Sequence, residues 1–108
     1  MTYWIPGRKL YKTSRPIPQD GVTVSFERRH VISQIGYLAD QHHFYFGETF
    51  EEVDMANIGD EAFKITLYGD DNIFELPQLE ADKVYYWRTD AQKGGYVYKG
   101  DVWSFFTI

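Results

Sequence analysis

The sequence predicts an all-β fold, a sandwich of two sheets made of about seven short antiparallel strands with one short helical turn. Several segments alternate between apolar and polar residues, which is the period of a strand with one buried face. Turn-forming residues separate these segments at intervals of roughly 8 to 14 residues, a spacing typical of small sandwiches. Aromatic residues make up 19% of the 108 residues, and such large rings can fill the core of a domain of this size.

The clearest pattern lies near the C-terminus, where two alternating segments flank a glycine turn. In 85–91 the odd positions suit a core and the even positions are polar or amphipathic, and the returning segment 96–106 continues this parity. Gly94 and Gly95 between them reach positive φ at little cost, so a β-hairpin is expected. The residues expected to hold the core together are Leu79, Tyr85, Trp87, Trp103 and Phe105.

The other strands follow from shorter runs of the same alternation. Residues 1–15 show no sustained period, so we interpret them as a tail or linker and expect the domain to span 16–108. Pro16 and Pro18 force an extended entry into this domain. The expected strands are 22–26, 30–37, 42–46, 62–68, 73–76, 85–91 and 96–106.

One short helix is expected between the third and fourth strands. Gly47 ends the third strand, and Thr49 with Glu52 three residues later forms a capping-box pattern. Phe50 and Val53 are also three residues apart and are expected to face the sandwich. The number and spacing of the strands, together with this helix, are typical of an immunoglobulin-like sandwich.

Charge and composition exclude several classes of protein. The formal net charge is −5, which argues against a nucleic-acid binder, since such proteins need a basic patch to neutralise phosphates. The chain has no cysteine, so it has neither a disulfide framework nor a thiolate metal site. No apolar run approaches the roughly 20 residues of a membrane-spanning helix, and the N-terminus lacks a signal-peptide pattern. We therefore expect a soluble monomer that does not insert into a membrane.

The sequence contains no pattern typical of a catalytic or cofactor site. His42 and His43 are neighbours on one expected strand, so their side chains point to opposite faces and are poorly placed to bind one metal ion. The acidic segments 54–60 and 70–72 lack the calcium-loop pattern, and helix capping and turn formation explain them more simply. A nucleophile elbow, an HExxH motif and a phosphate-binding glycine loop are also missing. We expect no enzyme activity, no metal and no cofactor.

Three blocks of the sequence carry a resemblance to one known family of domains. They are the proline turn at 16–21, the run Phe44-Tyr45-Phe46-Gly47 followed by Val53 and Ala56, and the run Tyr85-Tyr86-Trp87-Arg88 with Gly100-Asp101-Val102-Trp103-Ser104-Phe105. Over residues 16–107 these blocks resemble the fibronectin type III-like domains of large bacterial secreted and surface proteins. Such domains often lie beside glycan-degrading enzymes and sulfatases.

The resemblance implies roles for individual residues and a cellular setting. Leu79, followed six residues later by Tyr85, is similar to the tyrosine corner of such sandwiches, in which the phenol bonds to upstream backbone. Phe106 stands where the family usually has threonine, which puts an extra apolar ring on an outward position. The setting implied is extracellular or periplasmic, with an export signal outside this chain and with neighbouring domains of the same polypeptide as partners.

The outward positions of the hairpin and of the strand 42–46 are rich in tyrosine. Projected onto one sheet, they form a face whose rings can stack on sugars, with Arg88 as a donor to hydroxyl groups. Packing on a neighbouring domain and contact with a protein partner are the other interpretations, since tyrosines also pair across strands. The residues of this face are Tyr45, Tyr86, Arg88, Tyr96, Tyr98 and Phe106.

The sequence therefore predicts a non-catalytic accessory module of a larger protein that acts on polysaccharide. Its role would be that of a spacer, a domain-packing element or a protein-interaction module. The alternative is a carbohydrate-binding module that uses the tyrosine-rich face.

Overall fold

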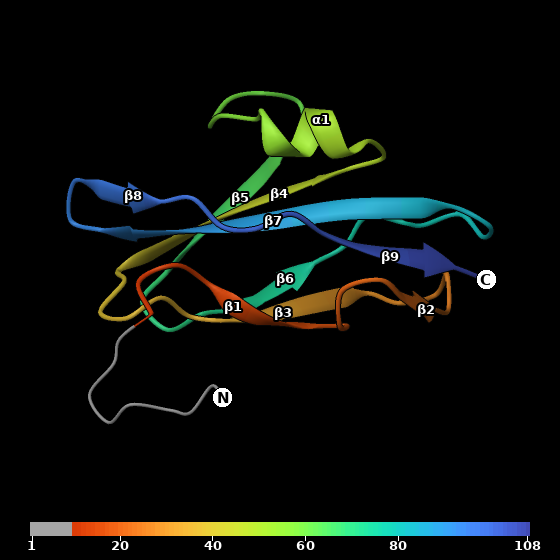
Figure 1. Cartoon of the computed structure of the whole chain (residues 1–108), viewed down its shortest axis with the longest axis horizontal. Helices are drawn as coiled ribbons and strands as arrows, with labels where there is room; N and C mark the ends of the chain where they lie inside the picture. Colours follow the sequence, from red (N-terminus) through yellow and green to blue (C-terminus); the bar gives the residue numbers. More distant parts are fainter. Residues whose placement is uncertain (1–9) are drawn as a thin grey trace, which may run out of the picture.

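The computed structural model describes residues 10–108 and shows two β-sheets packed face to face (Figure 1). The smaller sheet has the strand order β1-β3-β6, and the larger has the order β2-β9-β7-β4-β5, with β8 paired to β7. The helix α1 covers the outer face of the larger sheet, which is the face turned away from the smaller sheet (Figure 1). The elements are β1 (Ser14–Ile17), β2 (Val22–Val24), β3 (His30–Gln34), β4 (Gln41–Gly47), α1 (Phe50–Asp54), β5 (Phe63–Tyr68), β6 (Ile73–Glu75), β7 (Val84–Lys93), β8 (Tyr96–Tyr98) and β9 (Trp103–Thr107).

This arrangement confirms a two-sheet, mostly β domain with one short helix, but residues 10–108 form nine strands rather than about seven. One additional strand, β1, lies partly in the segment predicted to be a tail, and the predicted strand 96–106 is divided into β8 and β9. The strands β2 and β9 run parallel, whereas the other pairs are antiparallel.

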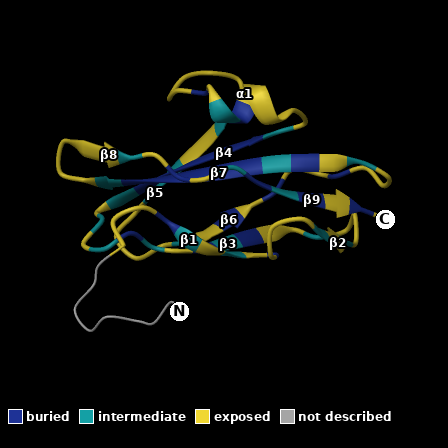
Figure 2. Ribbon diagram, viewed as in Figure 1, coloured by how far each residue is buried: buried dark blue, intermediate teal, exposed yellow. Residues whose placement is uncertain are grey.

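Large rings fill the space between the two sheets. Phe44 stacks on Phe74 of the opposite sheet with ring centroids 4.9 Å apart, and Trp87 meets Trp103 edge-on at 4.8 Å. Figure 2 shows the buried residues of β4 and β7 in the middle of the molecule. The five core residues expected from the hairpin all lie here, each at most 6% exposed: Leu79, Tyr85, Trp87, Trp103 and Phe105.

Tyr85 makes the bond expected of a tyrosine corner. Its hydroxyl oxygen accepts a hydrogen bond from the backbone N–H of Glu80 at 2.9 Å. Leu79, the residue before Glu80, is 2% exposed and belongs to the same core. The loop that leads into β7 is therefore held by both a buried side chain and a backbone bond.

The folded domain begins before Pro16. Thr13 is fully buried and donates its hydroxyl to the carbonyl oxygen of Thr89 at 2.8 Å, and Leu10 accepts from the N–H of Tyr37 at 2.8 Å. The boundary predicted at residue 16 is thus too late for residues 10–15, while residues 1–9 lie outside the described part. Alternation failed to reveal β1 because its register shifts between its two ends and because Arg15 has a positive φ of 48°.

The helix α1 begins with the expected capping box. The Thr49 hydroxyl accepts from the backbone N–H of Glu52, and the Glu52 carboxylate accepts from the N–H of Thr49. Val53 is fully buried against the sheet, as predicted. Phe50 is instead 46% exposed at the rim, where its ring meets that of Tyr86 edge-on at 6.2 Å. Within residues 10–108, no helix has the length and apolarity needed to cross a bilayer.

Candidate functional site

The six residues of the predicted face do not form one surface. Directly paired residues of antiparallel strands point to the same face. Arg88 pairs with Tyr45, so these two share the outer face of the larger sheet with Tyr86. Tyr98 pairs with Ala91 instead, which has the parity of the core-facing residues of β7. Tyr96 and Tyr98 are therefore on the opposite side from Arg88.

A single additional residue between β8 and β9 explains this division. Ala91 pairs with Tyr98, and Trp87 pairs with Trp103. On β7 the two residues are four positions apart, whereas their partners are five positions apart on the returning chain. One additional residue reverses the face to which the following side chains point. The prediction that Tyr96, Tyr98 and Phe106 share a face is therefore wrong.

Arg88 lies beneath α1 and is only 2% exposed. Its Nε donates to Oδ1 of Asp90 at 2.8 Å, and Nη2 donates to Oδ2 of the same carboxylate at 2.9 Å. Nη1 donates to the carbonyl oxygens of Val53 at 2.6 Å and Asp54 at 3.0 Å, and Nη2 also donates to that of Ala56 at 2.9 Å. A guanidinium has five N–H donors, and all five are used. Arg88 therefore cannot donate to a sugar hydroxyl without giving up one of these bonds.

The surroundings of Asp90 and Tyr45 are equally closed. Oδ1 of Asp90 also accepts from the backbone N–H of Gly100 at 2.9 Å. Tyr45 is 3% exposed, and the guanidinium carbon of Arg88 lies 4.1 Å from its ring centroid. Burial, followed by the charge of Asp90, raises the pKa of the Tyr45 hydroxyl. A shallow hollow of about 400 Å³ lies beside Arg88 and Asp90. The residues that line it are Asp54, Met55, Ala56, Asn57, Arg88, Asp90, Val97 and Lys99.

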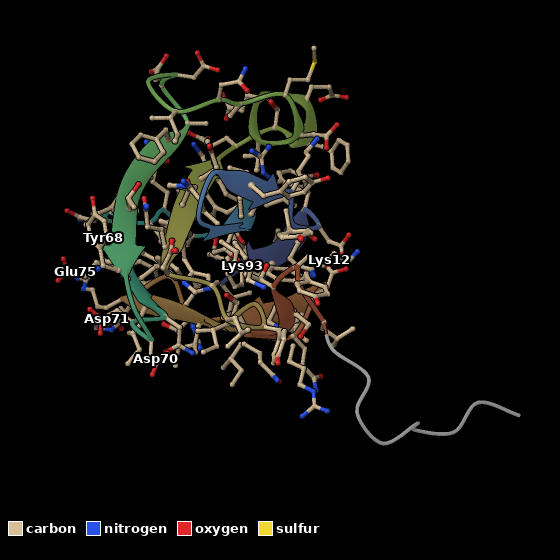
Figure 3. The ribbon with its side chains drawn as sticks, turned by 90° about the vertical axis from the view of Figure 1, so that its left-hand side faces the viewer. Lys12, Tyr68, Asp70, Asp71, Glu75 and Lys93 are labelled. Atoms are coloured by element: carbon tan, nitrogen blue, oxygen red, sulfur yellow. The ribbon has the colours of Figure 1, made fainter. Side chains whose placement is uncertain are left out.

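Four tyrosines gather at the end of the sandwich formed by the β7–β8 hairpin. Tyr11 stacks on Tyr98 with centroids 5.2 Å apart and rings inclined by 23°, and Tyr37 meets Tyr11 edge-on at 5.6 Å. Tyr96 follows Tyr98 at 4.7 Å. We call this set, in the spatial order Tyr37, Tyr11, Tyr98, Tyr96, the tyrosine row. Figure 3 views the molecule from this end and labels Lys12 and Lys93, the charged neighbours of the row.

Phe106 lies away from the tyrosine row, near the C-terminal end of the chain. It pairs with Val84 on the outer face, and the two side chains are 37% and 41% exposed. The prediction that Phe106 points outward therefore agrees with the strand register. Its nearest apolar neighbour across the ladder is an aliphatic side chain, not another ring of the predicted face.

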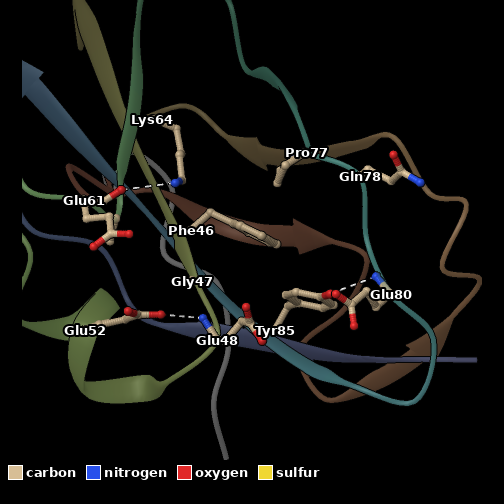
Figure 4. Close-up of a pocket in the computed structure, with 11 residues that line it drawn as sticks. Phe46, Gly47, Glu48, Glu52, Glu61, Lys64, Pro77, Gln78, Glu80 and Tyr85 are labelled. Carbon is tan, nitrogen blue, oxygen red and sulfur yellow. Dashed lines mark hydrogen bonds between the residues drawn. The ribbon is translucent and has the colours of Figure 1, made fainter.

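A cleft of about 270 Å³ opens where β4, α1, β5 and the β6–β7 loop meet (Figure 4). The rings of Phe46 and Tyr85 stack in it at 5.3 Å, but each residue is only 5% exposed. Lys83 lies close by and reaches Glu48 at 2.8 Å and Glu80 at 3.4 Å. Hydrogen bonds to these two carboxylates raise the pKa of Lys83. The cleft is thus a polar hollow with more carboxylates than lysines in its lining, and its buried rings offer little surface for stacking.

The two adjacent histidines lie on opposite faces of β4, as predicted. His43 faces outward and bonds Thr66 Oγ1 through Nδ1 at 2.7 Å and Gln92 Oε1 through Nε2 at 2.6 Å. His42 faces inward, is fully buried, and accepts from the N–H of Gly36 through Nε2 at 3.2 Å. Within the described residues, no three histidine or acidic side chains are grouped so that they could hold a metal ion.

Sequence reasoning missed half of the tyrosine row. Tyr11 fell in the segment taken for a tail, and Tyr37 fell at the end of an expected strand. Tyr11 lies in no alternating run, and the alternation of 30–37 does not indicate that its last residue, Tyr37, meets Tyr11. An aromatic residue next to a lysine in a supposed tail, at Tyr11-Lys12, was the one available hint.

No protein-family model matches the chain, and no curated protein is significantly similar to it.

Proposed function

We propose that this chain is a non-catalytic accessory module of a larger extracellular or periplasmic bacterial protein that acts on polysaccharide. The observation that carries the proposal is that Arg88 and Asp90, the one buried ion pair among the described residues, are engaged in hydrogen bonds within the protein. Every donor of Arg88 is bonded within the protein, and the carboxylate of Asp90 binds Arg88 and Gly100. These groups stabilise the fold.

The resemblance to fibronectin type III-like domains supports this proposal. The residues that carry it have structural positions: Trp87 and Trp103 lie in the core, and Tyr85 makes the corner bond. Two sheets with this core and corner are compatible with an immunoglobulin-like sandwich. The setting in a glycan-degrading protein is inferred from the family resemblance, which rests on these sequence blocks. This setting is therefore part of the proposal.

The path of the chain also suits a spacer or a domain-packing element. The described chain begins beside the β7–β8 hairpin and ends beyond β9, at the other end of the sandwich (Figure 1). A module entered at one end and left at the other can separate two neighbouring domains by its own length.

Carbohydrate binding through the predicted face is not supported, because its six residues do not form one exposed surface. Tyr45 and Arg88 are covered by α1, and Tyr96 and Tyr98 point to the other side. A carbohydrate-binding surface would have to be built from a different set of rings.

Turnover measurements on the full 108-residue chain test the non-catalytic proposal. We expect no hydrolysis of a panel of polysaccharides and sulfate esters above the buffer control. The proposal would be contradicted by turnover that disappears when a single carboxylate, such as Glu61 in the cleft of Figure 4, is replaced by glutamine while folding is retained.

A further inference from the structure

Three isoleucines lie side by side across the outer face of the smaller sheet. Ile17 of β1 pairs with Ile32 of β3, and Ile32 pairs with Ile73 of β6. Directly paired residues of antiparallel strands point to the same face. On β3 the residues before and after Ile32, which are Val31 and Ser33, are fully buried. The three isoleucines therefore point away from the core.

This isoleucine stripe, Ile17-Ile32-Ile73, is apolar and yet accessible to solvent. Ile17 is 52% and Ile73 57% exposed, and Ile32 between them is half-buried. The helix α1 lies on the larger sheet, and within residues 10–108 no helix or strand covers the outer face of the smaller one (Figure 1). Contiguous exposed apolar surface rimmed by polar residues marks interaction sites.

The two ends of the isoleucine stripe carry opposite charges. At the β6 end, Glu75 has the parity of Ile73, and Asp71 is exposed in the turn just before this strand. Figure 3 shows Asp71 and Glu75 together on one side of the molecule. At the β1 end, the exposed charge is that of Arg15. None of these three side chains forms an ion pair with another residue in 10–108.

Arg15 and Asp71 also lie at the same end of the smaller sheet. Both β1 and β6 run antiparallel to β3, so these two strands run in the same direction. Arg15 is two residues before Ile17, and Asp71 is two residues before Ile73. The basic group on one edge and the acidic group on the other are therefore level with each other, on either side of the isoleucine stripe.

This arrangement makes the face complementary to itself. Two copies that pack the same face together are related by a two-fold axis between their sheets. With the axis parallel to the strands, the β6 end of one stripe meets the β1 end of the other, and Ile32 meets its own copy. Asp71 of each copy then faces Arg15 of the other. With the axis across the strands, each acidic β6 edge would meet another acidic β6 edge.

We propose that the outer face of the smaller sheet is the interface of a homodimer. Two isoleucine stripes pack together around an axis parallel to the strands, with Arg15 of each copy paired to Asp71 of the other. A dimer goes beyond the accessory-module proposal, which needs no second copy, and it differs from the monomer expected from sequence. A standard interface takes about 800 Å² from each partner. Three short strands offer a small face, so we expect a dissociation constant on the order of 100 µM.

Sedimentation equilibrium of the full chain, from about 10 µM to about 1 mM, tests for this dimer. We expect Ile73→Lys to weaken association at least about tenfold, because it places a charge inside the apolar contact. Ile58→Lys is the matched control. Ile58 is 59% exposed in the turn after α1, on the far side of the larger sheet, and its substitution should leave association unchanged. Urea unfolding checks that both variants fold.

Arg15→Glu and Asp71→Arg test how the two copies are oriented. Each variant alone places like charges opposite each other, so its self-association should be about five- to tenfold weaker than that of the wild type. An equimolar mixture should associate like the wild type. In the mixed dimer, the new carboxylate faces the new guanidinium, and the Arg15 retained in one variant faces the Asp71 retained in the other.

Three results would overturn the proposal. A chain that stays monomeric at about 1 mM has no such interface, and the isoleucine stripe would then be left for a neighbouring domain to cover. Equal weakening by Ile58→Lys and Ile73→Lys would place self-association on another surface. A mixture of the two charge variants that associates no better than each alone would exclude the two-fold arrangement. None of these results affects the accessory-module proposal, which depends on turnover.

Discussion

His42 is a fully buried polar side chain whose environment favours the neutral ring. Because Nε2 accepts from the N–H of Gly36, the proton of the neutral imidazole lies on Nδ1. That nitrogen has no partner in the described part of the chain. Burial, and next the charge of His43, lowers the pKa of His42 below its ordinary value of 6.5, while Asp70 and Asp40 act in the opposite direction. Protonation would also remove the acceptor of Gly36.

The first prediction is that His42 makes the fold less stable in mild acid. Above pH 6.5 both the folded and unfolded states hold a neutral ring, so His42 contributes no pH dependence. As the pH falls below 6.5, the unfolded state binds a proton that the folded state does not, and the free energy of unfolding decreases by up to about 1.4 kcal/mol per pH unit. Urea unfolding of the wild type between pH 8 and pH 5 measures this slope.

The His42→Gln variant isolates the contribution of this ring. The glutamine amide oxygen can still accept from Gly36, but it does not titrate. We expect the variant to lose less stability than the wild type between pH 6.5 and pH 5. Parallel stability curves for the two proteins would show that another group causes the acid sensitivity.

The helix α1 has five residues, far fewer than an isolated helix needs to be stable in water. Its first turn is held by the capping box of Thr49 and Glu52. Its last turn is held by Arg88, which donates to the carbonyl oxygens of Val53 and Asp54. A helix leaves its last carbonyls unpaired. Here the carbonyl of Val53 also accepts from the N–H of Ala56 at 3.4 Å, while a side chain of the underlying sheet, Arg88, satisfies that of Asp54. The sheet therefore holds the helix in place.

The second prediction is that Arg88→Met detaches α1 and leaves the carboxylate of Asp90 buried without its cationic partner, with only the N–H of Gly100 still bonded to it. Removing one member of a buried ion pair costs about 3–5 kcal/mol, and the unpaired helix carbonyls add to this. We expect a large loss of stability in urea unfolding and faster amide hydrogen exchange across residues 49–56. Lys99→Met is the matched control. Lys99 forms an exposed pair with Asp54 at 3.0 Å, so its loss should cost less than about 1 kcal/mol.

The double variant Arg88→Met with Asp90→Asn separates the two effects. It removes the uncompensated charge, so part of the lost stability should return. Hydrogen exchange in α1 should stay fast, because the helix carbonyls remain unpaired. Full recovery of both measurements would mean that Arg88 acts only by neutralising Asp90.

The change of register between β8 and β9 shows the limit of what can be predicted from the alternation of apolar and polar residues. Within β7 and within β9 the predicted parity holds, since Tyr85, Trp87 and Phe105 all face the core. The parity could not be carried across 99–102, because one added residue there reverses it and has no period of its own. The burial of Arg88 escaped prediction for a related reason. The outer face of β7 is covered by a helix distant in sequence, and only the tertiary fold places it there.

At the level of the whole molecule, the N-terminal segment joins the two sheets. β1 pairs with β3 in the smaller sheet, while Thr13, the residue before it, donates to the carbonyl oxygen of Thr89 in the larger sheet at 2.8 Å. The Thr89 hydroxyl in turn donates to Thr13 Oγ1 at 2.8 Å and lies 3.1 Å from Ser33 Oγ of β3. Three buried hydroxyl groups thus bridge the sheets at the end that carries the tyrosine row. The sequence predicted the two sheets from their alternation but not this bridge, since isolated hydroxyl residues have no pattern that names their partners.

The third prediction concerns this bridge. Thr13→Val keeps the shape of the side chain but leaves the buried carbonyl of Thr89 without its donor, which costs about 1–3 kcal/mol. Thr23→Val is the control, because Thr23 lies exposed on β2 and its substitution should change stability by less than about 0.5 kcal/mol. Urea unfolding of both variants gives the comparison. Because Tyr11 is two residues from Thr13, loosening the bridge should also disturb the ring chemical shifts of Tyr11 and Tyr98, which Thr23→Val should leave alone. An unchanged stability in Thr13→Val would mean that β1 is held by its pairing with β3 alone, and that the row does not depend on the connection between the sheets.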